Sequence, residues 1–172
     1  MIDGDIHNVV HLIESGEIKH TQSKVHLPNY GVFDEQRIFK AGPLPAPLEF
    51  RGHNLGMLIC EDMWYADVAA RLKDQGAELL IVPNGSPFDT AKDETRLVHA
   101  KSRTKETGLP LVYVNQVGGQ DELVFDGGSF VLDADCTLRA QVPAFREALI
   151  VTEWRRGADH RWTCADALRE AP

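Results

Sequence analysis

Cysteine is scarce in this sequence, and the spacing of the few cysteines excludes two common uses of the residue. Cys60, Cys136 and Cys164 are far apart, and no two of them form a CxxC pair. A disulfide framework needs several cysteines at regular spacings, and a zinc knuckle needs CxxC pairs, so neither is predicted. Each cysteine is therefore judged by its own surroundings.

An excess of positive charge and a long apolar run are also lacking. The chain has 18 Lys and Arg against 26 Asp and Glu, a formal net charge of −8. This charge would repel a phosphate backbone, so nucleic acid is not a predicted partner. No apolar run approaches the roughly 18 residues that cross a bilayer, and residues 1–5 lack the pattern of a signal peptide. We expect a soluble, cytoplasmic protein with no membrane partner.

Metal and nucleotide motifs are missing as well. His7 and His11 are four residues apart, but the β-branched residues around them indicate a strand, and no carboxylate lies between them. No GxxxxGK pattern is present to cradle a phosphate. The sequence therefore predicts neither a bound metal nor a nucleotide cofactor.

The apolar residues that are present follow an α/β pattern. With 172 residues, of which 43% are hydrophobic, the chain can build one sizeable core. Strands are predicted at 55–59, 78–83 and 109–115, with helices at 66–75 and 90–107 between them. Gly76 and Gly108 follow these helices as C-caps. Alternating strands and helices imply parallel neighbours with right-handed crossovers.

Hairpins complete the predicted architecture, an α/β sandwich with a mixed sheet. Turn residues between extended runs predict hairpins over 5–25 and 48–59. A Gly-rich loop is expected over 118–128, followed by an antiparallel set at 129–133, 137–142 and 148–154. From Arg155 the sequence is polar and weakly patterned. We interpret 1–154 as one domain and 155–172 as a linker or tail.

Cys60 occupies a position that suits a nucleophile. It follows the predicted strand at 55–59 and directly precedes Glu61, Asp62 and a helix. At such a junction backbone N–H groups are free, and the helix dipole favours a thiolate. The alternative, commoner among cysteines, is that Cys60 is a small buried hydrophobic residue.

Three blocks of sequence decide between these alternatives. They are KVHLPNYGVFDEQRIF at 24–39, ICEDMW at 59–64 and YVNQVGGQDELVFDGGS at 113–129. Together they resemble the nitrilase superfamily, and within it the glutamine-amidase domain of glutamine-dependent NAD synthetases. This resemblance implies a nitrilase-like α-β-β-α sandwich. It also implies hydrolysis of glutamine to glutamate and ammonia through a cysteine thioester.

The resemblance assigns catalytic roles to three residues. Amide hydrolysis by a thiol needs a base and a donor that holds the tetrahedral oxyanion. Cys60 matches the nucleophile, and Lys24 matches the lysine that holds the oxyanion together with the backbone N–H of Glu61. Glu35 matches a second glutamate that orients the lysine and the leaving group. The alternatives are that Lys24 is a solvated charge and that Glu35 is a surface charge paired with Arg37.

Further residues match positions where the family builds its glutamine pocket: Tyr30, Glu61, Trp64, Ser86 and Lys92. The two aromatic residues would wall an apolar channel, and Ser86 with Glu61 would bind the polar end of the substrate. Lys92, with Arg96 four residues on, would meet a carboxylate. Aromatic core packing, a turn serine and solvated helix charges are the alternatives. Asn115, at the end of a predicted strand, is expected to support the site.

Two parts of the family pattern have no counterpart in the sequence. The family's triad glutamate precedes the lysine, whereas Glu14 and Glu17 belong to a predicted hairpin turn. Asp3, Gly4 and Asn8 resemble the family's Asp-Gly-x-x-x-Asn stretch instead. We therefore expect a partial domain without the first strand-helix units. Loss of a general base typically costs about 10²–10⁴-fold in rate.

The synthetase domain, which would use ATP and magnesium, is the second missing part. No cofactor is therefore predicted in this chain. The expected partners are glutamine, an NAD synthetase domain in the same or another chain, and further copies of the chain. The alternatives are another nitrilase-like amidase and an impaired subunit that only binds a partner.

Overall fold

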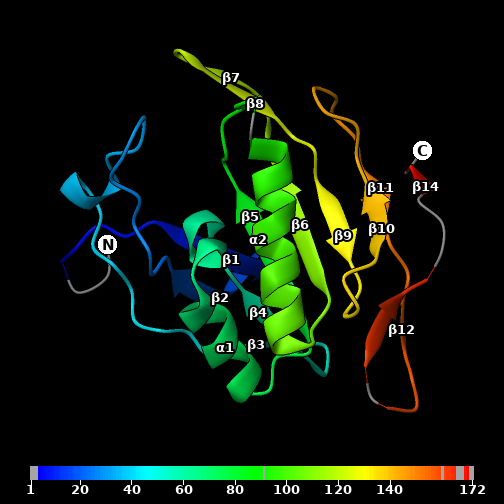
Figure 1. Ribbon diagram of the computed structural model, residues 1–172. Helices are drawn as coiled ribbons and strands as arrows, with labels where there is room; N and C mark the ends of the chain where they lie inside the picture. Colours follow the sequence, from blue (N-terminus) through cyan, green and yellow to red (C-terminus); the bar gives the residue numbers. More distant parts are fainter. Residues whose placement is uncertain (1–3, 91, 160, 166–168, 171–172) are drawn as a thin grey trace.

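A six-stranded mixed sheet lies at the centre of the computed structural model, which describes residues 4–90, 92–159, 161–165 and 169–170 (Figure 1). Its strand order is β10-β9-β6-β5-β4-β3. The strands of this sheet are β3 (Leu48–Phe50), β4 (His53–Met57), β5 (Leu79–Asn84), β6 (Leu111–Asn115), β9 (Phe130–Leu132) and β10 (Leu138–Gln141).

Two α-helices, α1 (Ala66–Asp74) and α2 (Lys92–Thr107), lie side by side on one face of this sheet (Figure 1). The pairs β4–β5 and β5–β6 are parallel, with one helix between the members of each pair. The predicted alternation of strands and helices is therefore confirmed. Among the described residues, neither α-helix is long and apolar enough to span a membrane.

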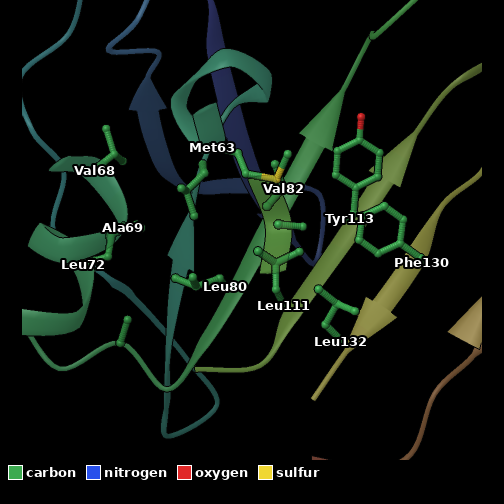
Figure 2. Packing of buried hydrophobic residues seen from close by; sticks show 13 residues of the cluster. Met63, Val68, Ala69, Leu72, Leu80, Val82, Leu111, Tyr113, Phe130 and Leu132 are labelled. Carbon is green, nitrogen blue, oxygen red and sulfur yellow. The ribbon is translucent and has the colours of Figure 1, made fainter. Parts of the chain in front are cut away.

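Apolar side chains between the helices and the sheet form the main core (Figure 2). Leu72 of α1 and Leu80 of β5 are fully buried there, as is Leu111 of β6. At the other side of the core the rings of Tyr113 and Phe130 stack, with centroids 4.7 Å apart and planes 6° apart. Buried apolar area of this kind is the main favourable term in folding, so this core holds the helices on the sheet.

Within the described part of the chain, the remaining strands form four two-stranded sheets. These are β1 (Val9–Glu14) with β2 (Glu17–Ser23), β7 (Val117–Gln120) with β8 (Leu123–Asp126), β11 (Ile150–Val151) with β14 (Arg169–Glu170), and β12 (Trp154–Arg156) with β13 (Trp162–Cys164).

Two-residue turns close both predicted N-terminal hairpins. Ser15 and Gly16 join β1 to β2 with φ values of 54° and 79°, and Arg51 and Gly52 join β3 to β4 with 52° and 82°. Positive φ at both central residues matches the twist of the paired strands, which explains the preference for such turns. Both hairpin predictions are confirmed.

Two predicted segments between β6 and Arg155 differ from the structure. The expected Gly-rich loop is instead the β7–β8 hairpin, which projects from the sheet (Figure 1) and turns at Asp121, whose φ is 52°. The third antiparallel strand, at 148–154, was wrongly placed, because β11 and β12 pair with β14 and β13 and not with β10. Pro143 follows β10 and lacks the N–H that a continuing ladder needs.

The segment after Arg155, predicted to be a linker or tail, contains regular structure. Cys164 of β13 is buried, and its N–H donates to Asp133 Oδ1 at 2.7 Å. Arg156 pairs with Glu78 across 2.6 Å. These contacts attach the β12–β13 hairpin to the body of the molecule, and they escaped sequence patterning because each joins residues far apart in the chain.

The core makes a stability prediction. Replacing Leu80 by Ala should lower the free energy of unfolding by about 2–5 kcal/mol, because the deleted atoms leave a cavity in a packed core. Leu80 is 0% exposed, whereas Leu138, the control, is 40% exposed. Urea unfolding should show a much smaller loss for Leu138→Ala. Equal losses in the two variants would contradict this account of the core.

Candidate active site

Cys60 lies at a sharp bend between the central sheet and α1. It begins the 3-10 helix η2 (Cys60–Trp64), three residues after the end of β4. Its φ is 50°, in the left-handed region that non-glycine residues rarely adopt. Strained backbone of this kind clusters at functional sites, where the surrounding structure must hold it in place.

The bend faces a cavity of about 430 Å³ at the carboxyl end of β5. Its lining brings together Lys24, Glu35 and Cys60, the three residues predicted to be catalytic. In open α/β sheets ligands bind outside the carboxyl ends of the strands, which is where this cavity lies. The rest of the lining consists of Asn8, Val9, Val10, Phe33, Ile59, Pro83, Asn84, Gly85, Gln116, Gln120 and Phe125.

Lys24 is buried in this cavity and paired with Glu35. Its side chain is 1% exposed, and Nζ donates to Glu35 Oε1 at 2.7 Å. Asn8 bonds to both partners: its carbonyl accepts the Lys24 N–H at 2.8 Å, and Nδ2 donates to Glu35 Oε2 at 3.5 Å. A buried ammonium without a partner would cost several kcal/mol. Lys24 is therefore not a solvated charge.

The neighbouring charges show that Glu35 is not a surface charge paired with Arg37. Glu35 begins the 3-10 helix η1 (Glu35–Arg37), and Arg37 pairs with Asp34 instead of Glu35. Asp34, the residue before η1, makes no side-chain cap there, and its carboxylate pairs with Arg37. Glu35 is thus free to turn inward to Lys24.

Burial has the largest effect on the pKa of the Cys60 thiol. It raises the pKa of the Cys60 thiol, and the charges of Glu61 and Glu35 act in the same direction. Lys24 and the backbone N–H of Glu61 lower this pKa by stabilising the thiolate. The resting group is therefore the thiol, and attack needs a base that removes its proton.

Glu61 and Tyr30, both predicted to belong to the glutamine pocket, lie together beside a second cavity. The Tyr30 hydroxyl donates to both Glu61 carboxylate oxygens, at 2.9 and 2.8 Å. Burial and this bond to Glu61 raise the pKa of Tyr30 above its ordinary value. Tyr30 and Glu61, together with His26 and Tyr65, line a polar cavity of about 540 Å³. The Glu61 side chain thus faces one cavity, and Cys60 lines the other.

Ser86 is engaged in a buried network. Its Oγ accepts from Arg96 Nε at 3.2 Å, and the Arg96 guanidinium pairs with Asp126 at 2.7 and 3.0 Å. The Asn115 amide bonds the Ser86 backbone N–H and carbonyl and also the Gly127 carbonyl. Ser86 is not among the residues that line the Cys60 cavity. Asn115 supports the loop that carries Ser86, and its predicted support of the Cys60 site stays a prediction.

Trp64 and Lys92 are not brought to the Cys60 cavity by any described contact. The Trp64 ring packs on His99 of α2, with ring centroids 4.3 Å apart. Lys92 is the first residue of α2, and its side chain lies outside the described part of the structure. The glutamine-pocket roles of these two residues stay predictions.

The buried pair of Arg96 and Asp126 is what sequence reasoning missed. Solvated charge was the simpler interpretation of Arg96, yet its side chain is 3% exposed and that of Asp126 is 0% exposed. A charged residue directly after the apolar residues 123–125 was the available signal, since an unpaired buried carboxylate is costly.

The charges around Cys60 predict opposite effects of two substitutions on thiol reactivity. Lys24→Met should move the pH midpoint of Cys60 alkylation upward by about one pH unit, because the cation that stabilises the thiolate is lost. Glu35→Gln should move it downward, because Glu35 raises the thiol pKa. Peptide-resolved mass spectrometry of iodoacetamide labelling measures both, with Cys136 as internal control. Shifts of the same sign would contradict this electrostatic account.

The Arg96–Asp126 pair predicts a large loss of stability. Arg96→Met should lower the free energy of unfolding by about 3–5 kcal/mol, because it leaves the Asp126 carboxylate buried without its guanidinium. Lys101→Met, on the exposed face of the same helix, is the control. Chemical denaturation that shows equal stability for the two variants would contradict the assignment.

Comparison with known proteins gives consistent matches. The carbon-nitrogen hydrolase family matches residues 3–159. A glutamine-dependent NAD(+) synthetase from Rhodobacter capsulatus is 45% identical over 163 residues, which cover 94% of this chain and 30% of that protein. The chain thus spans less than a third of the length of this relative.

Solved structures with the same fold include an NAD+ synthetase and an amidase. The glutamine-dependent NAD+ synthetase of Acinetobacter baumannii superposes with a TM-score of 0.87 at 36% identity, covering 100% of this chain and 32% of that one. An amidase from Nesterenkonia sp. AN1, solved after Michael addition of acrylamide at its active-site cysteine, gives 0.64 at 29%, covering 74% and 49%. The predicted nitrilase-like α/β fold is thereby confirmed, and the chain belongs to the carbon-nitrogen hydrolase family.

Proposed function

We propose that the Cys60 cavity hydrolyses the side-chain amide of glutamine and supplies ammonia for NAD synthesis. The observation that carries this proposal is the buried Lys24, held by Glu35 in the cavity that Cys60 also lines. A cation of this kind is suited to stabilise the oxyanion of an attacked amide. The similarity to glutamine-dependent NAD synthetases supports glutamine as the substrate.

The proposed reaction proceeds through a thioester. The Cys60 thiol loses its proton to a base, and its sulfur attacks the amide carbon. The resulting oxyanion is held by Lys24 Nζ and the backbone N–H of Glu61, which already stabilises the thiolate. The C–N bond then breaks, and ammonia leaves with the proton. Water cleaves the γ-glutamyl thioester to give glutamate and restores the thiol.

Proton transfer is the demanding step for the residues described here. Among the described residues that line the cavity, Glu35 supplies the one carboxylate. It can accept the thiol proton only by weakening its bond to Lys24, which makes it a poor base and a good orienting group. Glu14 and Glu17 pair with Arg51 and Lys19 instead. We therefore propose slow turnover by these residues alone.

The polar end of glutamine would bind beside Glu61. The Glu61 carboxylate can bind an α-ammonium group, and Tyr30, which donates to both Glu61 oxygens, fixes its orientation. Ser86 would contribute indirectly, since its hydroxyl accepts from Arg96. This arrangement would place the substrate across the boundary between the two cavities, with its side-chain amide toward Cys60.

The proposal also requires a partner that uses the ammonia. We propose a synthetase unit, in the same or another chain, because the similar NAD synthetases are about three times as long as the matched region. By the same resemblance we propose a cytoplasmic homo-oligomer. Sedimentation velocity tests the oligomer, and a monomer at micromolar concentration would exclude it.

Labelling with a glutamine-like diazo-ketone tests the proposed substrate. This reagent should alkylate Cys60, and excess glutamine should protect it, because both compete for one pocket. Cys60→Ala should abolish the labelling, with Cys136 as an unlabelled internal control. Lys24→Met should lower the rate of ammonia release from glutamine by about 10²-fold or more, as loss of an oxyanion donor does.

The outcomes separate the competing functions. A folded chain whose Cys60 resists saturating diazo-ketone would exclude the glutaminase. Release of ammonia from other amides, with glutamine inert, would indicate a different nitrilase-like amidase. Labelling of Cys60 without turnover of any amide would leave a subunit that binds substrate or partner and does not catalyse.

A further inference from the structure

Asp62, two residues after Cys60, is completely buried and accepts three hydrogen bonds from the backbone. Asp62 is 0% exposed to solvent. Its Oδ1 accepts from the N–H groups of Val25, at 3.1 Å, and His26, at 2.8 Å. Its Oδ2 accepts from the N–H of Ile59 at 3.0 Å. All three donors belong to the polypeptide backbone.

The donors adjoin the two residues that carry the chemistry. Val25 directly follows Lys24, and Ile59 directly precedes Cys60. Because the two oxygens of one carboxylate have a fixed separation, their bonds define the distance between these backbone segments. A difference of about 1 Å at this distance is enough to change a reaction rate about 10²-fold.

Few other described bonds join these two segments. The backbone of Lys24 itself bonds to Asn8 and Gly42, which belong to other parts of the chain. Gln22 donates to the Met57 carbonyl at 2.8 Å, three residues before Cys60. The Asp62 carboxylate is thus the link that reaches the residues next to Lys24 and Cys60.

The bond to Ile59 also restrains the strained bend. Cys60 has a φ of 50°, and the Asp62 N–H donates to the Ile59 carbonyl at 3.1 Å while its carboxylate accepts from the Ile59 N–H. Asp62 therefore holds both polar groups of the residue before the nucleophile. A strained conformation persists only where its surroundings over-determine it in this way.

We propose that Asp62 is a positioning residue for the reaction of Cys60. It holds the Lys24 segment and the Cys60 bend at the separation in which the ammonium stabilises the thiolate and the oxyanion. It acts through backbone N–H groups and touches neither the substrate nor the sulfur. The catalytic part of this inference rests on the proposed glutamine hydrolysis, and the effect on thiol reactivity does not.

Asp62→Asn tests the proposal with little change of volume. The asparagine oxygen can still accept from Val25 and His26, but its NH₂ group then faces the Ile59 N–H, donor against donor. The link to the Cys60 bend is therefore lost, while the link to the Lys24 segment is retained. Asp67→Asn is the matched control, because Asp67 bonds to the half-buried His26 ring and no described hydrogen bond joins it to Val25 or Ile59.

Alkylation of Cys60 as a function of pH is the first readout. The midpoint should rise by about one pH unit in Asp62→Asn, because the Cys60 bend is no longer held where Lys24 stabilises the thiolate. It should stay unchanged in Asp67→Asn. A folded Asp62→Asn chain, judged by circular dichroism, with the wild-type midpoint would overturn the proposal. Purely structural support by Asp62 would lower the melting temperature without moving this midpoint.

Glutamine kinetics provide the second readout. The rates are normalised to the fraction of protein whose Cys60 reacts with the diazo-ketone. In Asp62→Asn, kcat should then fall about 10²-fold. KM should change less than about threefold, because the pocket for the polar end of glutamine is kept. An unchanged kcat would overturn the positioning role. If the wild-type chain does not hydrolyse glutamine, the proposed function fails, whereas the alkylation comparison still decides the role of Asp62.

A backbone variant covers the case in which Asp62→Asn does not fold. Replacing the amide between Lys24 and Val25 by an ester removes the Val25 N–H and leaves every side chain in place. This change deletes one of the three bonds to Asp62. The alkylation midpoint should rise in the same direction by a smaller amount, and an unchanged midpoint would overturn the proposal.

Discussion

The ion pair between Lys24 and Glu35 is the interaction on which the rest of the site depends. Burying an ammonium that is 1% exposed costs several kcal/mol without a carboxylate beside it, and Glu35 supplies that carboxylate at 2.7 Å. Three separate segments meet to form the pair. The loop before η1 sets Glu35 through the bond from its N–H to Pro28, and Asn8 bonds to both partners. The N-terminal hairpin is thereby attached to the site as well as to the sheet.

Opposing effects act on the pKa of the Cys60 thiol, and together they determine its reactivity. Lys24 lowers the thiol pKa, whereas burial and the two nearby glutamates raise it. A free thiolate would pair with Lys24 and compete with the oxyanion for the same cation. A resting thiol avoids this competition, because the negative charge then develops only during the attack. The same cation can therefore act on the transition state.

The sequence could predict features that depend on local pattern, and it could not predict features that depend on contacts between residues far apart in the chain. The helices, the parallel strands and the N-terminal hairpins follow from periodicity and turn residues, and the structure confirms them. Cys60, Lys24 and Glu35 were found through a resemblance, and they share one cavity. The role of Arg96 was missed because its partner Asp126 is 30 residues away. The strand β13 was missed because it pairs with β12 in a polar, weakly patterned hairpin, and its buried Cys164 bonds to Asp133, 31 residues away. The arrangement of Ser86 likewise depends on side chains that no local pattern relates to it.

The central claim is that Cys60 forms a covalent acyl intermediate with glutamine in this cavity. The most direct test is to mix the chain with glutamine and quench the reaction in acid. Mass spectrometry then measures the mass of the intact protein and of its peptides. The account predicts a γ-glutamyl adduct on the peptide that contains Cys60, absent from Cys60→Ala and diminished in Lys24→Met. Turnover of glutamine with no adduct at any quench time, or an adduct that persists in Cys60→Ala, would contradict it.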